Sequence, residues 1–105
     1  MTRVGDDTGV TREELELQLR EASRQIETLR LALVSRAVID QAKGVLMVQH
    51  GIDAEEAFAR LSNVSQHTNV KVAVLAQAVL DVARNKEVES ADVARTVRER
   101  LLAEG

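Results

Sequence analysis

Apolar residues recur every seven positions near the start of this chain, in two series that are offset by four. The two series contain six residues: Leu15, Leu19, Ala22, Ile26, Leu29 and Leu33. This is the spacing of the d and a positions of a coiled coil, in which each helix hides a narrow apolar stripe against a second helix. The alternative is an ordinary amphipathic helix packed on its own domain, but the strict spacing and the charged flanking residues favour a dimer. We therefore expect residues 11–34 to form a parallel, dimeric coiled coil.

The sequence also marks both ends of this helix. Thr11 and Glu14 have the spacing of a capping box, so we expect the helix to begin at Thr11. No strong helix breaker follows until Gly51, a good C-terminal cap, and the helix can therefore continue from the coiled coil into a globular domain. Residues 1–10 are polar and have no hydrophobic period, and we expect them to be disordered.

Three shorter helices are expected after Gly51, which makes the chain all-α. Asp53 and Glu56 form a second capping box, Asn69 or Thr68 is expected to cap a helix over 70–85, and Ser90 is expected to cap a fourth helix. The expected core residues of the first two elements of the bundle are Val38, Ile39, Ala42, Val45, Leu46, Ala57, Phe58, Leu61 and Val64. Residues 35–85 would then be a small three-helix bundle, and 90–105 an additional amphipathic helix with no identified packing partner.

Composition excludes several classes of function. The chain has no Cys and no Tyr, and its two His residues are seventeen positions apart, so we expect no catalytic group, no metal site and no cofactor. A net charge of −3 and a single aromatic residue, Phe58, argue against a basic field or a row of rings that binds nucleic acid. Neither a signal peptide nor a membrane span is visible, and we expect a soluble, cytoplasmic protein.

A polar stripe lies opposite the expected core face of the first helix. Its members are spaced by three and four: Arg36, Asp40, Lys43, Met47 and His50. The first three form either an exposed charge trio, which stabilises the helix by only tenths of a kcal/mol, or part of a binding surface. Gly44 adjoins the stripe, and either close helix packing or close approach of a ligand would explain it. His50 is interpreted as a helix-end residue, and Met47 as a filler of gaps or a contact for a base.

The second half of the first helix and the residues after it resemble the ANTAR domain, found in bacterial transcription antitermination regulators. The resemblance covers residues 32–83 and rests on "SR" at 35–36, Ile39, "AKG" at 42–44, "LM" at 46–47, Gly51, "EAF" at 56–58, Leu61, "SQ" at 65–66, Asn69 and Lys71. These elements occur in the order and at the spacing of the family, and heptads typically precede them. The match is therefore far more specific than a single short motif.

The resemblance implies a dimer that binds paired stem-loops in nascent leader RNA and prevents formation of a terminator hairpin. The residues that match the family motif and are expected on the RNA surface are Arg36, Lys43, Gly44, Ser65, Gln66, Asn69 and Lys71. Arg60 is added on geometry alone, because its spacing places it with Asn63 and His67 on one face of the helix that begins after Asp53. Family members usually carry a sensor domain before the coiled coil. Only about ten residues precede it here, so we expect a short form that takes its regulatory signal from a separate protein.

Two other functions remain open from the sequence. A coiled-coil adaptor would use the heptads and the fourth helix to bind another regulatory protein. A DNA-binding factor would place a helix pair in the major groove, but the acidic net charge disfavours it because DNA affinity rests largely on phosphate neutralisation.

Overall fold

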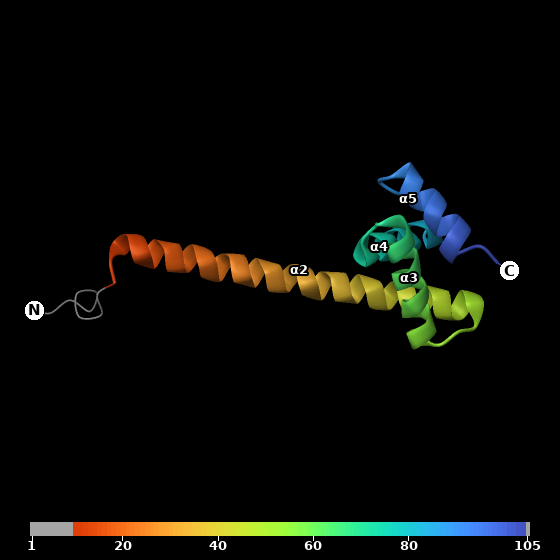
Figure 1. The fold of residues 1–105 in the computed structure, drawn as a ribbon, viewed down its shortest axis with the longest axis horizontal. Helices are drawn as coiled ribbons and strands as arrows, with labels where there is room; N and C mark the ends of the chain where they lie inside the picture. The colour runs from red at the N-terminus through yellow and green to blue at the C-terminus, as the bar shows by residue number, and fades with distance from the viewer. Residues whose placement is uncertain (1–9, 105) are drawn as a thin grey trace, which may run out of the picture. The chain divides into compact units, whose positions relative to one another are not determined.

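The computed structural model describes residues 10–104, and every regular element within them is helical (Figure 1). In chain order the elements are α2 (Arg12–His50), α3 (Ala54–Thr68), α4 (Val72–Ala83), α5 (Ala91–Thr96) and the π-helical turn η1 (Val97–Leu101). The all-α class is thus confirmed. Residues 1–10 are expected to be disordered, and all of them except Val10 lie outside the described range.

The two ends of α2 are formed by the caps that the sequence predicts. The Thr11 hydroxyl accepts a hydrogen bond from the Glu14 amide, and the Glu14 carboxylate accepts one from the Thr11 amide, each at 3.1 Å. At the other end Gly51 has a φ of 64°, and its amide donates to the Met47 carbonyl at 2.9 Å. The left-handed backbone conformation costs glycine little energy, and a residue in this conformation ends the helix.

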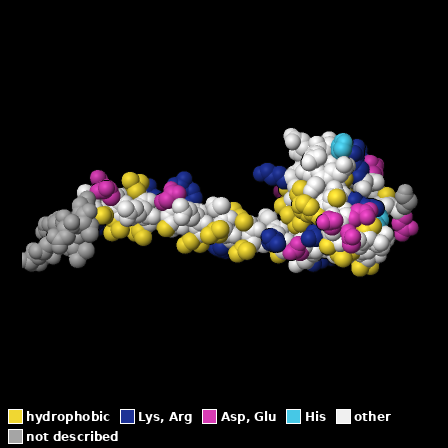
Figure 2. All heavy atoms as spheres, turned by 60° about the horizontal axis from the view of Figure 1, so that its bottom comes forward, with side chains coloured by type: hydrophobic (Ala, Val, Ile, Leu, Met, Phe, Trp, Pro, Cys, Tyr) yellow, Lys and Arg dark blue, Asp and Glu magenta, His cyan; other side chains and the backbone are white. Residues whose placement is uncertain are grey.

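Two compact units make up the chain, with the boundary between Leu33 and Val34. In the first unit, the heptad residues Leu15, Leu19, Ile26, Leu29 and Leu33 are between 49% and 69% exposed, and Ala22 is also exposed. Figure 2 shows hydrophobic side chains uncovered along this part of α2. Ion pairs such as Arg24–Glu21 (2.7 Å) and Arg30–Glu27 (3.3 Å) run along the same helix. A single copy therefore leaves the apolar stripe in contact with water.

The second unit, from Val34 onward, contains the hydrophobic core. Eleven buried residues form one cluster: Ala42, Leu46, Ala57, Leu61, Val64, Leu75, Ala76, Ala78, Val79, Val97 and Leu101. Val38, Ile39 and Val45 of α2 are partly buried and pack against this cluster, as does Met47. The core positions predicted for α2 are therefore correct. Met47, in contrast, is predicted on the polar stripe opposite the core, but it is partly buried and packs against the core cluster.

Phe58 is not a core residue, contrary to the sequence-based prediction. Its exposed fraction is 44%, whereas Ala57 and Leu61 are fully buried. The buried stripe of α3 is centred on Ala57, Leu61 and Val64, and Phe58 is rotated from Ala57 by about 100° on the helix. The residue consequently lies at the margin of the buried stripe, where it is partly in contact with solvent.

The boundary between α3 and α4 also differs from the prediction. The segment "SQHT" continues α3 to Thr68, and Asn69 ends that helix in the left-handed region (φ 61°, ψ 26°) with its amide bonded to the Ser65 carbonyl at 2.8 Å. Asn tolerates this conformation better than most residues, so it acts here as a C-cap and not as the N-cap of the next helix. Lys71 occupies the N-cap position of α4 and provides no side-chain hydrogen bond.

The C-terminal segment, for which the sequence identifies no packing partner, packs into the bundle. Ser90 caps α5 as predicted, by accepting from the Val93 amide at 3.3 Å, and Val97 and Leu101 are buried in the core cluster. α3 and α4 both contact η1. His50 Nε2 lies 2.7 Å from the Leu101 carbonyl oxygen, and the Gln49 amide donates to the Leu102 carbonyl. Side chains at the end of α2 thus bind carbonyls that the end of η1 leaves without helical partners.

Candidate nucleic-acid interface

The polar stripe of α2 (Arg36, Asp40, Lys43, Met47 and His50) contains an ion pair and an exposed arginine. Lys43 Nζ lies 3.3 Å from Asp40 Oδ1, with the Lys43 side chain 24% exposed and the Asp40 side chain 58% exposed. Arg36 is exposed, and no residue between 10 and 104 forms an ion pair with it. An i,i+3 ion pair at the surface of a helix, such as this partly exposed one, contributes only tenths of a kcal/mol. Lys43 can therefore exchange Asp40 for a phosphate at little cost.

Gly44 faces open space in the structure. A Cβ atom added to it would meet no atom within 4 Å, apart from its own helix backbone and neighbours. Within the described part of the chain, close helix packing therefore does not explain this glycine. A shallow groove lies beside it, lined by Gly44, Val45, Val48, Gln49 and Glu104. The α2 backbone is accessible at this point, which is the condition for close approach of a ligand.

A second group of predicted residues lies around the turn between α3 and α4. Gln66, Asn69 and Lys71 are exposed and Ser65 is partly exposed. None of the described residues forms an ion pair with Lys71, and the start of α4 behind it has no side-chain cap. The first amides of a helix carry partial positive charge, so Lys71 and this helix end together favour an anion.

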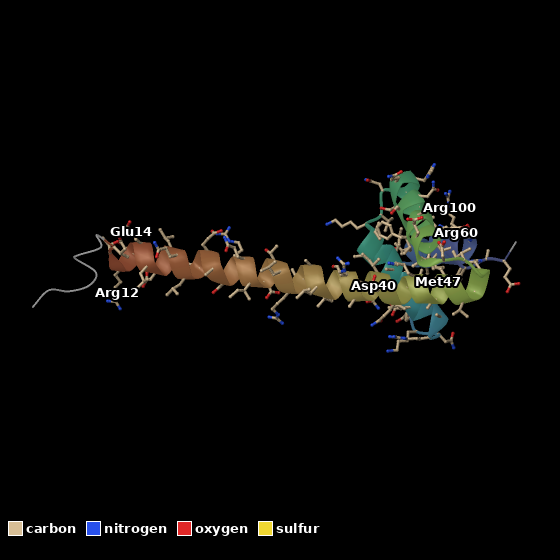
Figure 3. The ribbon with its side chains drawn as sticks, turned by 90° about the horizontal axis from the view of Figure 1, so that it is seen from below. Arg12, Glu14, Asp40, Met47, Arg60 and Arg100 are labelled. Atoms are coloured by element: carbon tan, nitrogen blue, oxygen red, sulfur yellow. The ribbon has the colours of Figure 1, made fainter. Side chains whose placement is uncertain are left out.

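Arg60 lies on α3, while Asp40 and Met47 lie on α2 (Figure 3). The Arg60 guanidinium is 3.0 Å from Glu56 Oε2, and 40% of its side chain is exposed. The Glu56 amide donates to the Asp53 carboxylate at 2.8 Å, which is one half of the predicted capping box. The Glu56 carboxylate accepts from Arg60 and not from the Asp53 amide, so the second half of the box is not formed. Apart from Arg60, the predicted site residues fall into an α2 group (Arg36, Lys43 and Gly44) and a turn group (Ser65, Gln66, Asn69 and Lys71). No hydrogen bond or ion pair within residues 10–104 joins the two groups.

Three further exposed side chains, which sequence reasoning did not select, have the chemistry to contact RNA: Phe58, Arg98 and Arg100. Phe58 offers an exposed ring, and ring stacking is a common way to hold an unpaired base. Arg98 and Arg100 of η1 are exposed and have no ion-pair partner among the described residues. The helical spacing in the sequence already places Phe58 outside the buried stripe of α3 and thus indicates that it is exposed. The charge pattern of η1 does not reveal which arginines remain unpaired.

Among the described residues, neither a cluster of metal ligands nor a membrane-spanning helix is present. Between residues 10 and 104, no three His, Asp or Glu side chains are grouped so that they would hold a metal ion. No helix in the same range has the length and hydropathy needed to cross a bilayer. The candidate surface thus consists of placed cations, amides and hydroxyls around exposed backbone, which suits recognition of a polar polyanion.

Comparison with known proteins identifies a family. The family model of the ANTAR domain matches residues 27–80, which include the second half of α2, all of α3 and most of α4. The nitrate regulatory protein of Klebsiella oxytoca is 34% identical over 65 residues, or 62% of this chain. The chain spans only 16% of the length of that relative. No solved structure matches the chain significantly.

Proposed function

The chain belongs to the ANTAR domain family of transcription antitermination regulators, and from this premise we propose that it binds paired stem-loops in nascent leader RNA as a dimer. Binding would hold the transcript in a form that cannot complete a terminator hairpin. The observation that carries the proposal is the family match over the elements that present the α2 group and the turn group. In this proposal the protein acts in the cytoplasm by binding RNA, and it neither catalyses a reaction nor requires a cofactor.

The exposed apolar stripe at the heptad positions of α2 supports the dimer. Five large apolar side chains at heptad positions are about half exposed or more in a single copy. Burying such side chains stabilises association by about 1.5 to 3 kcal/mol each when burial is complete. A second copy in parallel orientation covers the stripe with an identical stripe, and two linked bundles then offer two RNA sites.

The charge distribution supports recognition by a few placed side chains. The net charge is −3, so a general attraction to phosphate is absent. The RNA contacts are assigned to Arg36, Lys43 and Lys71 at phosphates or bases, and to Ser65, Gln66 and Asn69 at base edges in a loop. Gly44 lets the RNA approach the α2 backbone, and Arg60 exchanges Glu56 for the ligand. With so few cations, affinity should depend only modestly on salt.

The RNA partners are to be identified by crosslinking the protein in cells and sequencing the RNA that is recovered. We expect enrichment of leader sequences that contain two adjacent stem-loops before a terminator. The variant Lys43→Ala should lose this enrichment, whereas Arg95→Ala should keep it, because Arg95 lies outside the matched region in an Asp92 ion pair (2.8 Å). Recovery of no RNA above the background of uncrosslinked cells would contradict the proposal and favour the protein adaptor.

A further inference from the structure

A pocket that the proposed RNA surface does not use lies between α4 and α5. Its volume is about 490 Å³, which falls within the usual range of small-molecule sites. α4 contributes Val74, Gln77 and Asp81. The segment leading into α5 contributes Val88 and Glu89, and α5 itself contributes Val93. α4 and α5 contact each other directly (Figure 1). The second wall of the pocket comes from residues that follow the family match at 27–80.

Five of the nine residues that line this pocket are apolar, and one of these five side chains is unusually exposed. Val88 and Val93 are partly buried against the core, whereas Val74 remains 46% exposed although it belongs to the most apolar helix of the bundle. No aromatic residue lines the pocket. A compact aliphatic group placed here would cover Val74, and recognition of charge must come from carboxylates, because no ring is present to face a cation.

Two carboxylates at the pocket have no cationic partner within residues 10–104. Asp81 Oδ1 accepts a hydrogen bond from Gln77 Nε2 at 3.0 Å, and this neutral donor leaves the negative charge uncompensated. Glu89 is exposed and forms no ion pair. The nearby cations Arg84 and Lys86 neither line the pocket nor pair with these carboxylates. The lining of the pocket therefore combines aliphatic side chains with two carboxylates and no lysine or arginine.

We propose that this pocket binds a small organic cation, a primary ammonium attached to a compact aliphatic group. The ammonium would lie between the carboxylates of Asp81 and Glu89, and the aliphatic group would lie against Val74, Val88 and Val93. Such a ligand bridges α4 and the segment leading into α5, and it stabilises the bundle because it binds the folded chain alone. The site is separate from the proposed RNA surface, so either proposal can fail without the other.

The proposal is tested with three probes of matched shape that differ in charge. Cyclohexylmethylammonium is the cation, cyclohexylmethanol the neutral analogue and cyclohexanecarboxylate the anion. Titration of the full chain is followed by NMR of the valine methyl groups. We expect saturable shifts of Val74, Val88 and Val93 with the cation, weaker binding of the alcohol, and the weakest binding of the anion.

Variants then assign the charge recognition. Asp81→Asn and Glu89→Gln should each weaken binding of the cation by about two- to fivefold, the effect of one partly exposed ion pair. Glu99→Gln is the matched control, because Glu99 is exposed on η1 and does not line the pocket. Absence of saturable shifts, equal binding of cation and anion, or full affinity in both carboxylate variants would overturn the proposal.

Discussion

Replacing Ile26 and Leu29 by Glu should convert the dimer to a monomer and abolish tight binding of paired stem-loops. Both side chains are exposed in a single copy, at 59% and 65%, so the fold of one chain does not depend on them. In a parallel dimer the change buries four carboxylates in an apolar seam, at a cost of several kcal/mol for each charge. Loss of the second binding site then lowers RNA affinity by about 10² to 10⁴.

Sedimentation and hairpin affinity measured on the same samples check this prediction. The matched control is Leu17→Glu with Leu31→Glu, two leucines that are each 58% exposed but lie outside the two heptad series. This control should remain dimeric and keep its RNA affinity. If the unchanged chain sediments as a monomer at micromolar concentration, the dimer is wrong.

Replacing Lys43 by Ala should weaken hairpin binding by about 1 to 3 kcal/mol, or roughly 5- to 150-fold, if the lysine contacts a base. Folding should be almost unchanged, because the Asp40 ion pair that is lost contributes less than about half a kcal/mol. Melting temperature and hairpin affinity separate the two effects. Arg95→Ala removes a similar i,i+3 pair with Asp92 outside the matched region and should change neither quantity by much.

The variant Asp40→Asn tests the direction of the electrostatic effect on hairpin affinity in the same experiment. The Asp40 carboxylate lies 3.3 Å from Lys43 Nζ and repels phosphate. Its removal should leave hairpin affinity unchanged or raise it, as long as Asp40 accepts no hydrogen bond from a base. A folded Lys43→Ala protein with unchanged affinity would remove Lys43 from the site.

The sequence predicts those parts of the fold that depend on local patterns. The caps at Thr11, Gly51 and Ser90 form as expected, because each depends on a few neighbouring residues. Asn69 shows the limit of this reasoning. It suits either an N-cap or a left-handed C-cap, and the length of α3 decides between them. The packing of the C-terminal segment depends on contacts between distant residues, such as His50 with Leu101, which no local pattern reveals.

The sequence predicts which residues form the candidate site, but not their ion pairs or their exposure to solvent. Family spacing selects Arg36, Lys43 and Lys71, but it does not show that Lys43 is paired with Asp40 while the other two cations have no ion-pair partner among residues 10–104. The open space at Gly44 likewise depends on which elements pack beside α2. Phe58 was placed in the core because it is large and apolar, yet its angle on α3 leaves it 44% exposed.

The central claim is that a dimer reads two stem-loops at once, and one titration tests it most directly. RNA recovered by crosslinking is prepared as the complete pair and as each hairpin alone, and all three are titrated with the unchanged chain at one salt concentration. The account predicts one dimer bound for each RNA pair, with affinity about 10² or more above that of either hairpin. Equal affinity for single and paired hairpins, or no binding to either, would contradict it.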